Sequence, residues 1–209
     1  MDVSFLDRSV RKFTELGDPT LLLCGGLGVF FCLWTQPTSR RIARDWAVAF
    51  GLCIALTISS KIFFYFADAA SGVERLRSPS GHVAIATTFY GGCALLLTFS
   101  NGTLTRVLAS VVTALFLLAL AGSRVVLGLH TLSEVAVAFF IGIFCFGVFA
   151  HRLDQGSSQS DAGQLATLLL LLVVTRFARI DAEGFIAFGA KNMIALQRMV
   201  ELRGHGISP

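Results

Sequence analysis

Two of the four histidines stand out because each ends a short polar segment beside a long apolar run. His82 ends the tetrapeptide Pro-Ser-Gly-His at residues 79–82, and His130 ends an octapeptide that begins with Ser-Arg at residues 123–130. An imidazole can act as a nucleophile, an acid or a base near neutral pH. The guanidinium of Arg124 has the planar, forked shape that suits phosphate. These residue types are candidate functional groups, and together they would suit phosphoryl transfer.

Phosphoryl transfer depends on fixed donors and positive charge, because negative charge spreads over three equatorial oxygens in its transition state. Lys61 lies near the end of an apolar run and can extend its amine toward the same region as Arg124. Ser80 and Gly81 precede a predicted helix, whose first backbone N–H groups form an anion site. Gly81 also lets the backbone approach a ligand closely. We therefore expect these four residues, together with Ser123, to contact a phosphate.

The composition predicts that the elements carrying these residues are membrane-spanning helices. Of the 209 residues, 55% are hydrophobic and only 14% are charged, with a mean hydropathy of +0.74. The apolar residues form long blocks, which is typical of an all-α polytopic membrane bundle. The net charge of +4 lies at the edges of these blocks, so we expect contacts with lipid headgroups and no binding of nucleic acid.

The apolar blocks number about six. Five predicted spans cover about residues 21–34, 46–66, 83–99, 107–121 and 132–150, and a shorter sixth block covers residues 165–174. Because the chain crosses the membrane at each span, the polar segments after the second and fourth spans face the same side. Both histidine motifs can therefore meet over one headgroup region.

The two ends of the chain have an amphipathic pattern. Residues 3–16 predict an interfacial helix. We expect this segment to be retained, because residues 1–34 contain four acidic side chains and lack a cleavage pattern. We assign residues 1–183 to the membrane domain and residues 184–209 to an amphipathic tail. The five cysteines lie within apolar blocks and are interpreted as small buried hydrophobic residues. The sequence does not indicate an oligomeric state.

The two motifs resemble those of the type-2 phosphatidic acid phosphatase superfamily. Residues 79–82 have the form of its Pro-Ser-Gly-His motif, and residues 123–130 have the form Ser-Arg-x5-His. The separation from His82 to Ser123 (123 − 82 = 41) is in the usual range for the family. The resemblance covers about residues 61–142 and implies a helical membrane phosphatase.

The resemblance also implies roles for individual residues. In the family the second histidine attacks phosphorus, so His130 is the expected nucleophile, and a carboxylate four residues later, here Glu134, orients it. His82 is the expected general acid for the leaving oxygen. Neither a metal nor another cofactor is expected. A simpler role for Glu134 is also open, because Thr-Leu-Ser-Glu at residues 131–134 has the pattern of a capping box.

The sequence departs from the family at two places. The family's carboxylate is usually Asp, and Glu134 is longer by one methylene. The family's first motif is Lys-x6-Arg-Pro, whereas Asp68 and Ala69 occupy the corresponding positions after Lys61. We expect Arg75 or Arg77, from the loop before the Pro-Ser-Gly-His motif, to replace the missing arginine.

The expected activity is hydrolysis of a lipid phosphate or diphosphate in the bilayer, through a phosphohistidine. The broken first motif keeps an alternative open, a catalytically inactive relative that binds lipid headgroups as a scaffold or moves lipids. Haloperoxidase chemistry is a weaker alternative, since enzymes of that kind are typically soluble.

The charges of the loops predict which side of the membrane the site faces. The loops opposite the site contain five arginines, which the positive-inside rule assigns to the cytoplasm: Arg40, Arg41, Arg44, Arg106 and Arg152. The basic residues 8, 11 and 12 oppose this orientation. We expect a plasma membrane protein with an external site, which in a bacterium is periplasmic.

Overall fold

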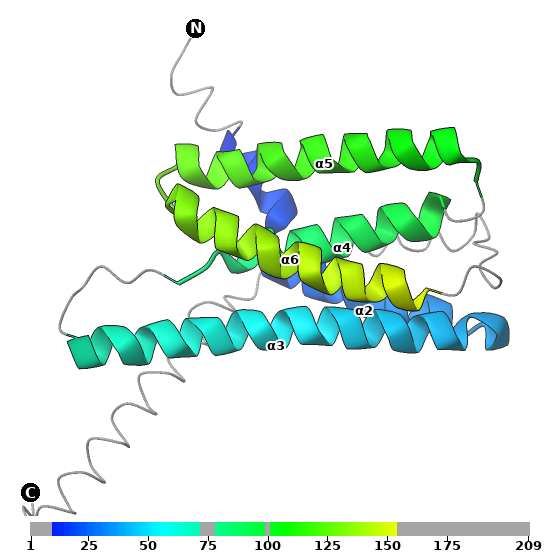
Figure 1. The fold of residues 1–209 in the computed structure, drawn as a ribbon, viewed down its shortest axis with the longest axis horizontal. Helices are drawn as coiled ribbons and strands as arrows, with labels where there is room; N and C mark the ends of the chain where they lie inside the picture. Colours follow the sequence, from blue (N-terminus) through cyan, green and yellow to red (C-terminus); the bar gives the residue numbers. More distant parts are fainter. Residues whose placement is uncertain (1–9, 72–77, 99–100, 154–209) are drawn as a thin grey trace, which may run out of the picture.

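The parts of the chain that the structure describes form helices joined by short connections. The computed structural model describes residues 10–71, 78–98 and 101–153. The main helices lie side by side along one long axis (Figure 1). Their order is α2 (Pro19–Trp34), α3 (Arg40–Ser71), α4 (Gly81–Thr98), α5 (Thr103–Val126) and α6 (Leu132–Arg152). The predicted all-helical fold class is confirmed.

Four helical segments are long and apolar enough to cross a membrane: Pro37–Ala67, α4, α5 and α6. A fifth crossing results if Val10–Gly17 and α2, which meet at an angle of 41°, count as one bent span. The second to fifth predicted spans therefore match α3 to α6 in order, and the first corresponds to α2, which counts as a crossing only together with Val10–Gly17. The sixth apolar block and the amphipathic tail lie outside the described residues.

The bend before α2 has a local cause in the sequence. Asp18 caps α2, because its Oδ1 accepts the backbone N–H groups of Thr20 at 2.8 Å and Leu21 at 3.1 Å. Pro19 occupies the first helical position, where its missing N–H is not needed. The chain therefore starts a new helix direction at Asp18.

Helix α3 is longer than the sequence predicted. It has 32 residues and continues to Ser71, whereas we expected the span to end near Phe66 and a polar loop to follow. Ala69 and Ala70 are strong helix formers, so the helix continues past the apolar run. At 1.5 Å per residue α3 is about 48 Å long, and it reaches past the other helices at one end of the bundle (Figure 1).

An aromatic cluster around Trp46 joins four helices. The indole stacks on Phe50 at a centroid distance of 5.5 Å and meets Phe89 and Phe149 edge to face. Its Nε1–H donates a hydrogen bond of 2.9 Å to the carbonyl oxygen of Gly26 in α2. Because lipid provides little hydrophobic driving force, such close contacts and buried hydrogen bonds hold membrane helices together.

Helix α4 is the central helix of the bundle, and its contact with α6 is the closest. A Cβ atom on Gly142 would lie 2.5 Å from Cβ of Thr87 and 2.7 Å from the carbonyl oxygen of Ala84. The hydroxyl of Thr88 lies 3.3 Å from the carbonyl oxygen of Gly142. Only glycine at position 142 permits this approach, which sets the distance between the two helices that carry the histidines.

We predict that Gly142→Ala lowers the thermal midpoint of the protein in detergent. The added methyl group overlaps backbone atoms of α4, and overpacking of this kind costs about 1–3 kcal/mol. Gly147→Ala is the matched control on α6, because a Cβ there has nothing within 4 Å. Equal midpoints for the two variants would contradict the described contact.

Candidate active site

The sequence-predicted site residues lie at one end of the bundle. Lys61 is on the second half of α3, and Ser80 and His82 are at the start of α4. Arg124 is in the last turn of α5, and His130 lies two residues before α6. These helix ends gather on the same side, on the left in Figure 1. The expectation that both motifs open on one membrane face is therefore consistent with the fold.

The segment from Arg124 to His130 is a helix ending with a defined hydrogen-bond pattern. The carbonyl oxygen of Arg124 accepts the N–H groups of Leu129 at 3.0 Å and His130 at 3.3 Å. The N–H of Gly128 donates to the carbonyl oxygen of Val125 at 2.9 Å. Gly128 has φ +67°, so the turn is a Schellman ending with glycine at the left-handed position. This ending brings His130 back toward Arg124.

His130 is paired with Glu134 on the first turn of α6. Their atoms Nδ1 and Oε2 are 2.7 Å apart. An ionised carboxylate only accepts hydrogen bonds, so in this pair Nδ1 carries the proton and Nε2 keeps its lone pair. The carboxylate is 8% exposed, which limits competition from water. The geometry therefore suits an imidazole that attacks through Nε2.

Glu134 also starts α6. Its Oε2 accepts the N–H of Thr131 at 3.3 Å, and the hydroxyl of Thr131 accepts the N–H of Glu134 at 3.4 Å. These reciprocal bonds form the capping box that the sequence predicted. One carboxylate thus contacts His130 and also completes the capping box.

The Pro-Ser-Gly-His motif is attached to the same turn of α6. The N–H of Ser80 donates to the carbonyl oxygen of Glu134 at a distance of 3.5 Å, and the carbonyl oxygen of Ser80 accepts the first α4 bond from Ala84. The Ser80 side chain is fully buried, and its hydroxyl has no hydrogen-bond partner among the described residues. A buried, unsatisfied hydroxyl beside a helix N-terminus is a donor suited to an oxyanion.

Lys61 lies against the start of α4. A Cβ on Gly81 would be 3.4 Å from Cε of Lys61 and 3.1 Å from Cγ2 of Thr57. The Lys61 side chain is buried at 8% exposure, although it is charged. The close approach explains why glycine suits position 81, and it brings the lysine ammonium to the α4 N-terminus.

His82 lies within electrostatic range of three other site residues, Arg124, Lys61 and His130. The two histidines, which are 48 residues apart in sequence (130 − 82 = 48), therefore belong to one site. His82 also lies near the two buried basic side chains, which suit phosphate.

Ser123 has a different environment from the one that the sequence suggested. Its hydroxyl donates to the carbonyl oxygen of Leu120 at 2.6 Å and lies 3.0 Å from the hydroxyl of Thr14. Thr14 precedes Ser123 by 109 residues. The sequence analysis missed this residue, because a lone threonine in an amphipathic segment carries no signal of such a contact.

Some predicted residues are not described. Arg75 and Arg77 lie outside the described residues, so replacement of the missing first-motif arginine stays a prediction. Within residues 10–71, 78–98 and 101–153, no group of three His, Cys, Asp or Glu side chains could hold a metal ion. The site that the structure describes thus consists of two imidazoles, a carboxylate, two cations and backbone donors.

Comparison with known proteins agrees with this site. Residues 63–156 match the family model of the PAP2 superfamily, the abbreviated name of the type-2 phosphatidic acid phosphatases. The match includes both histidine motifs and excludes Lys61. A Klebsiella pneumoniae protein described as an uncharacterized 22.5 kDa protein in the cps region is 34% identical over 131 residues. The alignment spans 60% of this chain and 60% of that relative. No solved structure matches the chain.

We predict that Gly128→Ala destabilises the α5–α6 turn. A left-handed conformation costs a residue with a Cβ about 1–2 kcal/mol, so the thermal midpoint should fall. Gly128→Asn should lose less, since asparagine tolerates this conformation. Gly122→Ala, on α5 with nothing within 4 Å of its Cβ, is the control. A midpoint for Gly128→Ala equal to that of the control would exclude the described turn.

Proposed function

Because the chain belongs to the PAP2 superfamily over residues 63–156, we propose that it is a membrane-embedded, metal-independent phosphatase that acts on a lipid phosphate or diphosphate. The observation that carries the proposal is the pair formed by His130 and Glu134, 2.7 Å apart, at the same end of the bundle as His82 and two buried cations.

In the proposed reaction Nε2 of His130 attacks phosphorus. A nitrogen–phosphorus bond forms as the bond between phosphorus and the lipid oxygen breaks, and His82 gives its proton to that oxygen. Glu134 stabilises the positive charge on the His130 ring. A water molecule then attacks phosphorus, gives a proton to His82, and breaks the nitrogen–phosphorus bond. Inorganic phosphate leaves, and both histidines return to their starting states.

The remaining groups stabilise charge on the phosphoryl oxygens. Arg124 and Lys61 are both less than 10% exposed, so their charges act in a medium that screens them weakly. The unpartnered hydroxyl of Ser80 and the first N–H groups of α4 add fixed donors. This arrangement supports a tetrahedral oxyanion as the bound group.

Apolar side chains around His130 support a lipid as the substrate. Val126, Leu129 and Leu132 are 77%, 48% and 73% exposed, and they flank the histidine on the α5–α6 turn. Exposed apolar residues next to a charged site fit a substrate with a phosphate head and hydrocarbon chains. The proposed phosphate position is therefore at headgroup depth.

We predict that purified protein releases phosphate from a short-chain lipid phosphate in excess chelator, and that His130→Ala lowers this activity at least about 1,000-fold by removing the nucleophile. His151→Ala is the matched control, because His151 is exposed in the last turn of α6 at the opposite end of the bundle. The measurement is phosphate release from a panel of phosphatidic acid, phosphatidylglycerol phosphate, polyprenyl diphosphate and lipid A phosphate substrates.

The outcome of this panel also decides between the proposed enzyme and the inactive alternative. Turnover that requires His130 and persists in chelator supports the enzyme, and the preferred substrate identifies the lipid class. Turnover that His130→Ala retains contradicts the proposed nucleophile. No turnover on any lipid favours a headgroup-binding scaffold.

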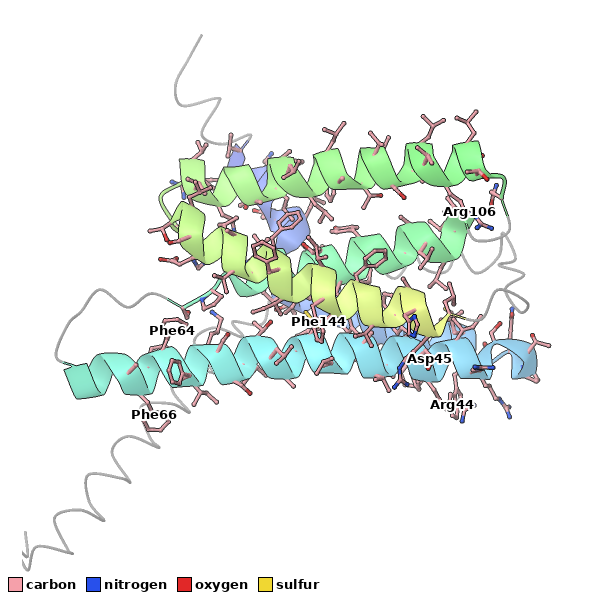
Figure 2. All side chains as sticks on the ribbon, viewed as in Figure 1. Arg44, Asp45, Phe64, Phe66, Arg106 and Phe144 are labelled. Atoms are coloured by element: carbon pink, nitrogen blue, oxygen red, sulfur yellow. The ribbon has the colours of Figure 1, made fainter. Side chains whose placement is uncertain are left out.

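The distribution of arginines supports an external site. Arg44 and Arg106 lie at the end of the bundle opposite Phe64 and Phe66, which are near the site end of α3 (Figure 2). Arg152 is at the same far end, 3.6 Å from Asp45. Loops rich in arginine stay in the cytoplasm, which leaves the site end outside.

We predict that alkaline phosphatase fused after Gly72 is active in bacterial cells, because this reporter folds only outside the cytoplasm. A fusion after Gly102, at the opposite end, should be inactive. A cytoplasmic reporter such as β-galactosidase should give the reverse pattern. Activity of the Gly72 fusion only with the cytoplasmic reporter would overturn the proposed orientation.

A further inference from the structure

The N-terminal helical segment Val10–Gly17 packs on the site end of the bundle. Phe13 meets Phe116 of α5 edge to face at a centroid distance of 5.7 Å. The hydroxyl of Tyr90 in α4 donates to the carbonyl oxygen of Leu16 at 2.8 Å. These contacts fix the segment on two helices that carry site residues.

Thr14 makes the contact that reaches the site. Its side chain is buried at 8% exposure, and its hydroxyl lies 3.0 Å from the hydroxyl of Ser123. The Ser123 hydroxyl is the donor toward Thr14, and it is also the donor toward the carbonyl oxygen of Leu120 at 2.6 Å. Its single proton is therefore shared between two acceptors, one on Thr14 and one on its own helix. These two contacts hold Ser123, and the next residue is Arg124.

The packing of α5 against the rest of the bundle is concentrated in its second half. Its first half is exposed, and its buried residues all lie in the second half: Leu117, Leu120, Ala121, Ser123 and Arg124. A rotation of the last turn would move the Arg124 guanidinium. The same rotation would move His130, because the Arg124 carbonyl oxygen accepts the N–H of His130. The orientation of this turn thus affects two groups of the site.

We propose that Thr14 is a positioning residue of the active site, which holds Ser123 and thereby fixes Arg124 and His130 for phosphate binding and transfer. This inference rests on the proposed phosphatase function. It makes the N-terminal segment part of the active site, although the segment lies outside the matched residues 63–156.

The test compares Thr14→Val, which removes the hydroxyl at constant shape, with Thr14→Ser, which keeps it. We predict that Thr14→Val lowers kcat about 5- to 30-fold with less than about a threefold change in KM, because the oriented arginine acts mainly in the transition state. Thr14→Ser should stay within about twofold of the natural protein. Thr98→Val, which removes a hydroxyl bonded to the Ala94 carbonyl oxygen at the far end of α4, should retain kcat.

A double-mutant cycle with Ser123→Ala separates positioning from general destabilisation. If Thr14 acts through Ser123, the kcat of the double variant should be about equal to that of the less active single variant. If the two residues act independently, the fold losses in kcat of the two single variants should multiply in the double variant. The proposal would be overturned by any of three results. These are fold losses that multiply in the double variant, an unchanged kcat in Thr14→Val, or a kcat in Thr14→Ser as low as in Thr14→Val.

A binding measurement keeps this inference distinct from the proposed function. Orthovanadate, a tetrahedral oxyanion, should raise the thermal midpoint of the natural protein and of Thr14→Ser, and raise it less in Thr14→Val. If the natural protein shows no turnover, the phosphatase proposal is contradicted. The change in thermal midpoint on adding orthovanadate would then still test whether Thr14 positions the anion-binding residues. Equal shifts in all three proteins would contradict the positioning role.

Discussion

The carbonyl oxygen of Arg124 is the acceptor on which the arrangement of the site depends. By binding the N–H groups of Leu129 and His130 it ends α5, reverses the chain and brings the histidine beside the arginine. Five residues separate Arg124 from His130. This spacing accommodates the Schellman ending and the additional hydrogen bond from the His130 N–H to the Arg124 carbonyl oxygen. In a bilayer, an unpaired backbone N–H or C=O group costs several kcal/mol, so the ends of helices need hydrogen-bond partners whether or not the protein has a catalytic site. Here the residues that provide these hydrogen bonds also form the site.

Two cations and one carboxylate come together at the site. Lys61 and Arg124 are basic, Glu134 is acidic, and all three side chains are less than 10% exposed. Charges in a region that water screens weakly act strongly on a bound ion. The two basic side chains therefore suit the phosphate group of the proposed substrate.

The sequence predicted local features well and tertiary contacts poorly. Apolar blocks, the capping box at residues 131–134 and the common end of the two motifs follow from patterns of nearby residues, and each has its counterpart in the structure. The extension of α3 to Ser71 was missed because the polar residue Asp68 suggested a loop, whereas alanines continue the helix. The contact between Thr14 and Ser123 could not be predicted, since 109 residues separate the partners and nothing near Thr14 in the sequence marks it. No local sequence pattern predicts the lipid class either.

Because α3 is long, the position of Lys61 in the site depends on the thickness of the bilayer. Arg40 and Lys61 are 21 residues apart on one continuous helix (61 − 40 = 21), or about 32 Å at 1.5 Å per residue. This length is close to the ~30 Å hydrocarbon core of a typical membrane. A thinner bilayer is accommodated by helix tilt, and a tilt about the arginine end displaces the lysine end most. In the proposed phosphatase, lipid composition would then change turnover by shifting one ammonium group relative to α4, without any change in the substrate's own headgroup.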